Sequence, residues 1–281
     1  AQKRMQAGNY AEALDAYQKL AVDPRDNPRQ VGSDLQNALA CLQNLNRIKE
    51  ADAFLEKVAQ IHAENWRALQ AVADSYISTD HSGTIVAGKF ERGPHRGQGK
   101  VANAYERTRV RALQLMIKAM EKMERDYETS VKDLPDSAAA RGLAALPDKG
   151  EMGQFYQQFA QYWMGNRGYN EAWRLQYLSD VTVLPDYEEG YWYYRGGQSR
   201  GAPVDEKGNP VFHAIPRSFA EAKTDGERWR WCLMQAVERD PSRADSVRYQ
   251  FATFLNQQFG VQTMAEYGWR APDQDEEKAE S

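Results

Sequence analysis

The sequence predicts an all-α fold in which antiparallel helix pairs stack into a superhelix, interrupted by a small β-hairpin-like insertion. Three observations predict this fold. Apolar residues recur every three or four positions through most of the 281-residue chain, which is the period of an amphipathic helix. A short pattern, in which an aromatic residue or Ile is followed three residues later by Ala, occurs three times. Between these copies, two stretches rich in Gly and Pro break the helical period.

The three copies share small or turn-forming residues around one large apolar residue: Gly8, Tyr10 and Ala13; Ile48 and Ala51; Gly168, Tyr169 and Ala172. The glycine permits a tight turn between two helices, the large residue fills the space between pairs, and the alanine lets helices cross closely. The pattern resembles the tetratricopeptide repeat, whose period is about 34 residues, and Ala51 follows Ala13 by 38 residues. We therefore expect all three alanines to be buried between paired helices.

The elements follow in chain order. We expect tetratricopeptide-like repeats at 1–80, a Gly-rich basic loop at 81–101, a helix and connector at 102–150, helical repeats at 151–272 with an insertion at 181–216, and a disordered acidic tail at 273–281. The 81–101 stretch is also compatible with a small hairpin. Within the insertion, the run Tyr191–Tyr194 has strand propensity, and 204–212 predicts a hairpin that turns at Gly208 and Asn209.

Composition excludes several classes of protein. A net charge of −4 does not provide the basic field that nucleic-acid binding requires, and we expect no nucleic-acid partner. No apolar run approaches the roughly 18 residues of a membrane-spanning helix, so we expect no membrane insertion. The two cysteines, Cys41 and Cys232, are too few for a disulfide framework, and their apolar helical context predicts buried free thiols.

No motif predicts catalysis, a metal or a cofactor. The run 93–100 has the glycines of a phosphate-binding loop at the wrong spacing, and Val101 stands where a magnesium-binding Ser or Thr is needed. Cys232 and Gln235 have the spacing of an internal thioester but lie within a strong helical pattern. The four histidines include no i,i+4 pair, although His81 and His95 flank one loop.

Two groups of residues are candidates for binding. Tyr191, Trp192, Tyr194 and Arg195 combine aromatic rings with a guanidinium, a composition common in binding hot spots. Packing of the same rings onto the helical layer is the alternative interpretation. His95 and Arg96 lie in the basic loop, where we expect contact with an acidic partner.

Several runs of the chain resemble the N-terminal helical region of very large bacterial alpha-2-macroglobulin-like proteins: 107–116, 165–178, 184–191, 201–205, 226–231 and 257–264. The resemblance implies the leading segment of a long secreted, periplasmic or envelope-anchored protein of the protease-trap type. The thioester of that family requires Cys-x-Glu-Gln. Met234 stands where this pattern has Glu, so we assign no crosslinking residue to this chain from the resemblance.

The predicted function is a non-catalytic protein-interaction or scaffold module. Its partner would be another domain of the same long chain or a separate protein. A carbohydrate-binding or carbohydrate-active domain that uses the aromatic insertion is one alternative. A hydrolase with an unrecognised site is another.

Overall fold

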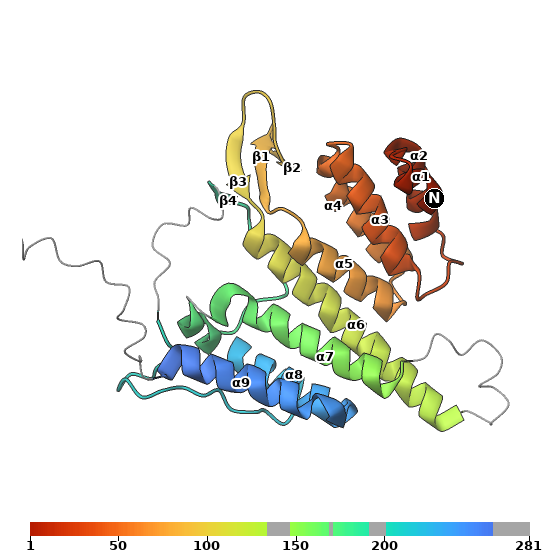
Figure 1. The fold of residues 1–281 in the computed structure, drawn as a ribbon. Coiled ribbons are helices and arrows are strands. Elements are labelled where there is room, and N and C mark those ends of the chain that lie inside the picture. Colours follow the sequence, from red (N-terminus) through yellow and green to blue (C-terminus); the bar gives the residue numbers. More distant parts are fainter. Residues whose placement is uncertain (134–146, 169–170, 191–200, 261–281) are drawn as a thin grey trace, which may run out of the picture.

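The computed structural model describes residues 1–133, 147–168, 171–190 and 201–260, which form a mostly helical protein with one small antiparallel sheet. Its α-helices within these ranges are α1 (Gln2–Gln6), α2 (Tyr10–Ala21), α3 (Val31–Asn44), α4 (Ala51–Ile61), α5 (Trp66–Ser78), α6 (Tyr105–Asp133), α7 (Lys149–Met164), α8 (Asp225–Arg239) and α9 (Ala244–Phe259). Figure 1 shows successive tilted layers that run from α2 and α3 through α5, α6 and α7 to α8 and α9.

The turn before α2 and the turn after α3 both contain a residue with positive φ. Gly8 has a φ of +78° between α1 and α2, and Asn46 has a φ of +55° between α3 and the 3-10 turn η1 (Ile48–Glu50) that leads into α4. Each residue lies five positions before the alanine of its copy, Ala13 or Ala51. Gly and Asn are the residues that adopt the left-handed region most readily, so the sequence prescribes both turns locally.

The three repeat alanines are all buried. Ala13, Ala51 and Ala172 are each 0% exposed, as predicted. Around the first two, α2 packs on α3, and α3 and α4 both contact α5. Tyr10 and Ile48, the large residues of these copies, are partly buried against the same core.

The third copy does not form a second α-helix, contrary to prediction. Ala172 lies in a short 3-10 helix, η4 (Ala172–Gln176), which follows another 3-10 turn, η3 (Gly165–Gly168). Arg167 occupies the place of Gly8 and Asn46, and the left-handed turn falls at Gly165 instead, with a φ of +51°. A run of β-branched residues ending at Pro185 then disfavours helix, so the next α-helix is α8. Tyr169 lies outside the described residues.

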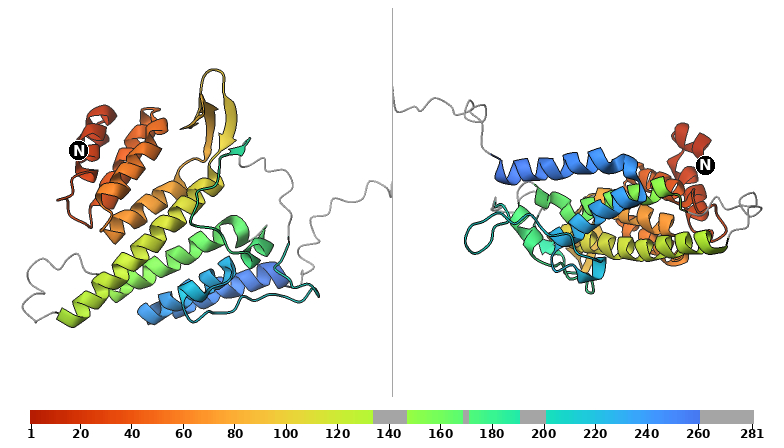
Figure 2. Two further views of the ribbon diagram at one scale, coloured as in Figure 1. Left: turned by 180° about the vertical axis from the view of Figure 1, so that it is seen from behind. Right: turned by 90° about the horizontal axis from the view of Figure 1, so that it is seen from below.

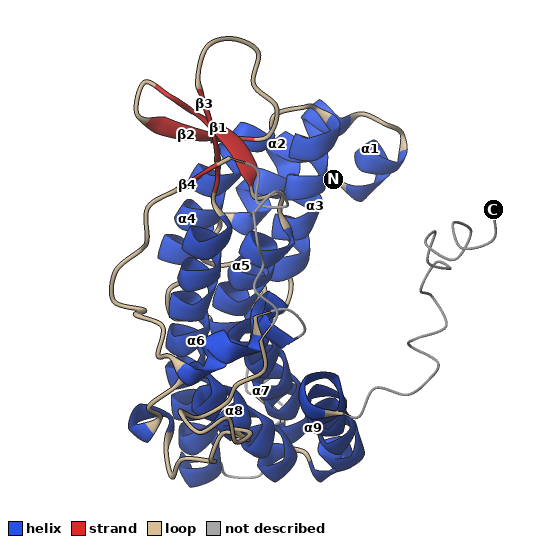
Figure 3. Ribbon diagram, turned by 90° about the vertical axis from the view of Figure 1, so that its left-hand side faces the viewer, coloured by secondary structure: helices blue, strands red, loops and turns tan. Residues whose placement is uncertain are grey.

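Three strands of the sheet lie in the stretch predicted as a basic loop or small hairpin, where the hairpin alternative is confirmed, and the fourth strand comes from the predicted insertion at 181–216. Its order is β2-β1-β3-β4, all antiparallel, with bounds β1 (Ser82–Val86), β2 (Lys89–Arg92), β3 (Lys100–Asn103) and β4 (Glu188–Glu189). Ala87 and Gly88, both with positive φ, form the two-residue turn between β1 and β2. Figure 3 shows the sheet at one end of the helical stack, beyond the ends of α5 and α6.

The predicted hairpin at 204–212 is only partly present. The turn is there: Gly208 has a φ of +82°, and the Asp205 carboxylate accepts hydrogen bonds from the main-chain N–H groups of Lys207 and Asn209. Strand pairing is limited to one isolated bridge, Val204 to Pro210. Proline has no N–H to donate, so a longer ladder cannot form at this position.

One hydrophobic core runs from α2 to α9, but its composition changes along the chain. Around α2 to α5 it is rich in Ala and Leu. Around α7 and α8 it is built from large rings: Phe155, Tyr156, Phe159, Trp163 and Trp229. Figure 2 shows α9 as an outer layer, and within it only Val247 and Phe254 are buried.

Candidate functional site

A groove of about 430 Å³ lies between α3, α5 and the end of β2. Its lining comes from α3 and the turn after it, from the end of α5, and from the chain that leaves β2: Gln36, Leu39, Ala40, Gln43, Asn46, Ile48, Lys49, Ser75, Ser78, Thr79, Asp80, Glu91, Arg92, Gly93 and Pro94. The groove therefore joins two of the predicted repeats to the sheet that interrupts them.

Two local features hold the β2 side of this groove in place. Gly93 has a φ of +87°, and a Cβ there would lie 2.5 Å from the Cγ2 of Ile48, so only glycine permits this approach of strand to helix turn. Arg92, whose side chain is 1% exposed, donates to the Asp52 carboxylate of α4 at 2.8 Å and to the main-chain oxygen of Asp80. The wall is thus anchored to the helical layer rather than suspended in solvent.

The lining of the groove combines exposed amides with an apolar floor. Gln36, Gln43 and Asn46 are exposed, and their side chains make no hydrogen bond with any described residue. Leu39 and Ala40 lie between the two glutamines along α3. Each primary amide can both donate and accept hydrogen bonds. It can therefore pair with the C=O and N–H groups of an extended polypeptide main chain.

Charge in the groove is concentrated at its β2 end. Asp80 and Glu91 contribute two carboxylates and Lys49 one ammonium, while the Arg92 charge is offset by Asp52. The net charge of Asp80, Glu91 and Lys49 together is −1. A basic side chain in a bound ligand would therefore be favoured at this end.

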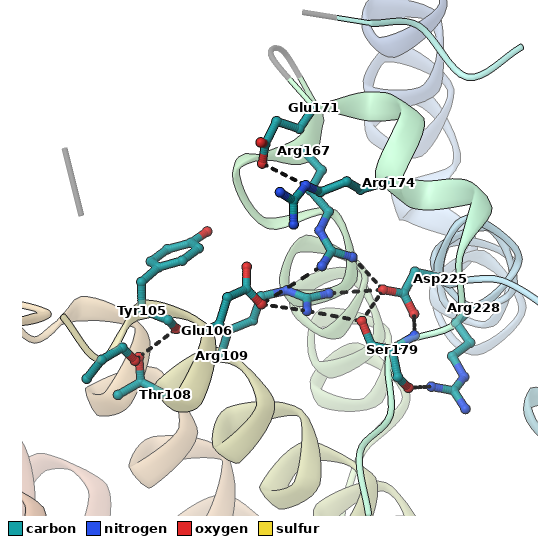
Figure 4. Close-up of polar contacts among 11 residues, drawn as sticks. Tyr105, Glu106, Thr108, Arg109, Arg167, Glu171, Arg174, Ser179, Asp225 and Arg228 are labelled. Atoms are coloured by element: carbon teal, nitrogen blue, oxygen red, sulfur yellow. Dashed lines mark hydrogen bonds and ion pairs between the residues drawn. The ribbon is translucent and has the colours of Figure 1, made fainter. Parts of the chain in front are cut away.

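A second polar cluster is buried and joins α6 to the start of α8. Figure 4 shows the guanidinium groups of Arg109 and Arg167 converging on the carboxylate of Asp225. One Asp225 oxygen accepts from Arg109 at 3.2 Å, from Arg167 at 2.5 Å and from the Ser179 hydroxyl at 2.5 Å. The other accepts from the Ser179 main-chain N–H at 2.8 Å. Glu106 lies 3.5 Å from Arg109 and completes a cluster of two cations and two anions.

This cluster has the properties of a structural clamp. Asp225 is 0% exposed and Arg109 2%, and burial lowers the pKa of Arg109 below its ordinary value. Ser179 is hydrogen-bonded to a carboxylate and a guanidinium, with no imidazole in the cluster to activate it. The two positive and two negative charges of the cluster sum to zero, and their contacts hold the segment around Ser179 between α6 and α8.

The histidines are separated from one another. The His81 ring lies 3.0 Å from the Thr108 hydroxyl, and burial together with Arg92 lowers its pKa to about 4. Burial also lowers the pKa of His213 to about 4, with Arg230 contributing. Within the part of the chain that the structure describes, no group of three or more His, Cys, Asp or Glu residues is placed to hold a metal ion.

Of the residues predicted to bind, the structure places two. His95 is half-buried and lies 3.4 Å from Glu91, and Arg96 is exposed in the turn between β2 and β3. Neither lines the groove, but Glu91 to Pro94, just before them, do. Tyr191, Trp192, Tyr194 and Arg195 lie outside the described residues, as does the tail 273–281.

The other motifs of the sequence have structural roles. Lys100 begins strand β3 rather than a helix, so the glycine run before it lacks the helix N-terminus of a phosphate-binding loop. Cys41 and Cys232 are buried free thiols, as predicted. The Gln235 side chain donates to Glu238 on the same helix, while Cys232 faces the core and burial raises its pKa.

No protein-family model, no curated protein and no solved structure matches this chain. The resemblance to alpha-2-macroglobulin-like proteins therefore stays a prediction. Within the described ranges, no helix combines the length and the apolar character needed to span a membrane.

Proposed function

We propose that this chain is a non-catalytic protein-interaction module whose groove between α3, α5 and β2 holds an extended polypeptide segment. The observation that carries the proposal is the lining of that groove, where unpaired amides flank an apolar floor. The bound segment would place an apolar side chain against Leu39 and Ile48. It would place a basic side chain near Asp80 and Glu91.

The arrangement of the first helices supports a tetratricopeptide-like superhelix as the framework of this module. Left-handed turns at Gly8 and Asn46 stand at equivalent positions, and both are followed by a buried alanine. α3 and α5, the first helices of successive pairs, line the groove together. In such stacks the first helices form the concave, ligand-binding surface. The superhelix is proposed for 1–80 and not for the third copy.

The proposal is tested with a random peptide library selected against the intact chain. The selected peptides are then measured against a variant with Gln36→Lys and Gln43→Lys, which places two cations in the groove without touching the core. We expect the selected peptides to carry a basic residue next to an apolar one and to bind this variant at least about ten-fold more weakly, an affinity loss of about 1.4 kcal/mol.

A matched control adds two lysines elsewhere. Gln60→Lys on α4 and Gln257→Lys on α9 are exposed positions away from the groove, and this variant should bind like the native chain. Equal loss of binding in both variants would point to net charge rather than the groove. No loss in the groove variant would refute the proposal.

The setting of the module is proposed from the resemblance alone. As the N-terminal part of a macroglobulin-like envelope or secreted protein, it would dock other domains of that protein or recruit a partner. The complete reading frame tests this proposal. Members of that family are expected to have a leader peptide upstream and on the order of a thousand further residues downstream. A short frame without a leader would end the family proposal and leave the groove experiment unaffected.

A further inference from the structure

Another cavity, of about 280 Å³, shares only Arg92 with the groove. Helices α4, α5 and α6, strand β2 and the segment before β4 contribute to its wall: Asp52, Glu56, Tyr76, Arg92, Ala104, Arg107, Thr108, Arg111, Leu184 and Tyr187. Three guanidinium groups and two carboxylates therefore meet in one small space.

Two of the three guanidinium groups are fully engaged. Arg92 is paired with Asp52, and Arg111 donates to both oxygens of Glu56 at 2.7 and 2.6 Å. The Tyr76 hydroxyl donates to Glu56 at 2.7 Å. Burial alone would raise the pKa of Glu56, but these hydrogen bonds outweigh it and hold the pKa below its ordinary value. Each carboxylate of the cavity is thus already paired with a guanidinium, Asp52 with Arg92 and Glu56 with Arg111.

Arg107 is the third guanidinium, and within the described residues no carboxylate pairs with its charge. It is half-buried, its Nη1 donates to the main-chain oxygen of Pro185 at 2.8 Å, and it forms no ion pair with a described residue. The edge formed by Nε and Nη2 donates to no described residue. That edge is the fork with which arginine binds a carboxylate through two parallel hydrogen bonds.

An aromatic stack holds Arg107 in this orientation. Its guanidinium carbon lies 4.9 Å from the ring centre of Tyr187, and Tyr187 in turn stacks on Phe90 of β2 with 4.4 Å between ring centres. The Pro185 hydrogen bond fixes the opposite edge. The cation is therefore positioned before any ligand arrives, which lowers the entropy that binding must offset.

We propose that this cavity binds a monocarboxylate with a short apolar body, held through the free edge of Arg107. One uncompensated positive charge matches one carboxylate. A phosphomonoester carries about −1.5 to −2 charges at neutral pH and would meet Asp52 and Glu56 as like charges. Leu184, Ala104 and the Tyr187 ring provide an apolar wall for the carbon body. The carboxylate can belong to a polypeptide or to a free small acid.

The test follows the Arg107 Nε–H resonance by NMR while butanoate is added at constant ionic strength, with inorganic phosphate as the competing anion. The native chain should show a saturable shift with butanoate and a weaker response to phosphate. Arg107→Gln should abolish saturable binding, seen in the neighbouring Tyr187 resonances. Tyr187→Leu, which removes the stack, should weaken binding about ten-fold, and Arg248→Gln on α9 serves as the control.

A shift that never saturates, or one that persists unchanged in Arg107→Gln, would overturn the proposal, as would tighter binding of phosphate than of butanoate. A peptide with a free C-terminus, compared with its amidated form, then identifies the source of the carboxylate. Tighter binding of the free-ended peptide than of butanoate indicates a polypeptide ligand, and the reverse a free acid. Both outcomes support the carboxylate site, and neither depends on the groove, since Gln36→Lys with Gln43→Lys leaves Arg107 untouched.

Discussion

The region from α2 to α5 and the region from α7 to α9 bury their surfaces in different ways. In the first, helices approach through small residues, and Ala13, Ala38, Ala51 and Ala68 are all 0% exposed. In the second, rings fill the space: Trp229 packs edge-to-face on Phe254 at 4.8 Å, and Trp163 and Phe219 both lie near the guanidinium of Arg228.

The difference extends to polar groups. The first region places the amides of Gln36 and Gln43 at the surface, where they line a groove. The second region buries the carboxylate of Asp225, on which two arginines converge. Helices that contact one another through small residues can stack with regular spacing, and one side of the stack stays exposed to solvent. A core of rings and buried ions is specified by particular pairs of residues. The first region is therefore suited to presenting a binding surface and the second to stabilising the end of the molecule.

The largest effect is expected from Asp225→Asn. The variant removes the charge on which Arg109 and Arg167 converge and leaves two buried cations with Glu106 as their main counterpart. Breaking a buried pair in this way costs about 3 to 5 kcal/mol, which urea denaturation will measure. Asp245→Asn, at an exposed pair on α9, should stay within about 0.5 kcal/mol of the native chain. A small cost at Asp225 would remove the distinction between the two regions.

Overpacking the alanine crossings should have the next largest effect. Ala13→Leu and Ala51→Leu insert three extra carbons into closed helix contacts and should each destabilise the chain by about 1 to 3 kcal/mol. Ala11→Leu and Ala53→Leu, exposed positions on the same helices, are the matched controls. If the buried and exposed substitutions cost the same in thermal or chemical unfolding, small residues would not be what sets the helix spacing.

Much of the first region could be predicted from the sequence because its signals are local. Gly8, with its positive φ, and the buried alanines Ala13 and Ala51 lie in the predicted places, because short-range spacing alone predicts them. Only part of the groove could be predicted from the sequence. The loop at 81–101 indicated function, but Gln36 and Gln43 resemble any solvated helix face, although their spacing of seven does place them on one side of α3.

The second region could not be predicted from spacing. Asp225 lies 116 residues from Arg109 and 58 from Arg167, and no periodic pattern connects residues so far apart. The third repeat was predicted from Gly168, Tyr169 and Ala172, but position 167, where the other two copies have Gly8 and Asn46, is an arginine and is not suited to a left-handed turn. Arg107 gave no signal either, because an unpaired arginine on a helix is normally exposed.

Asp74, on the face of α5 that meets α7, links the two regions and should give them a pH dependence. Burial raises its pKa from 3.8 to about 6, although Gln158 donates a hydrogen bond to it. Because the folded pKa is the higher one, its contribution to stability is complete below pH 3.8 and is lost as pH rises through about 6.

Asp74→Asn keeps an oxygen that can accept the hydrogen bond from Gln158, but the amide side chain cannot ionise. It should therefore match the native chain in stability near pH 4 and exceed it by about 2 kcal/mol at pH 7.5, measured by urea denaturation at each pH. His81 and His213 titrate in both proteins, so their contributions cancel in the comparison. A difference that is independent of pH would show that the carboxyl group is not buried between α5 and α7.

The smallest change in stability is expected from removing the residues that cap the N-termini of helices. Asn65 caps α5 by accepting from the N–H groups of Arg67 and Ala68, and Thr224 caps α8 by accepting from that of Glu227. Capping satisfies N–H groups within the first turn, so it does not depend on what the helix packs against. Asn65→Ala and Thr224→Ala should each cost about 1 kcal/mol in chemical unfolding. A much larger loss at Thr224 would mean that its cap also positions Asp225, and the ion cluster would then govern the end of α8 as well as its core.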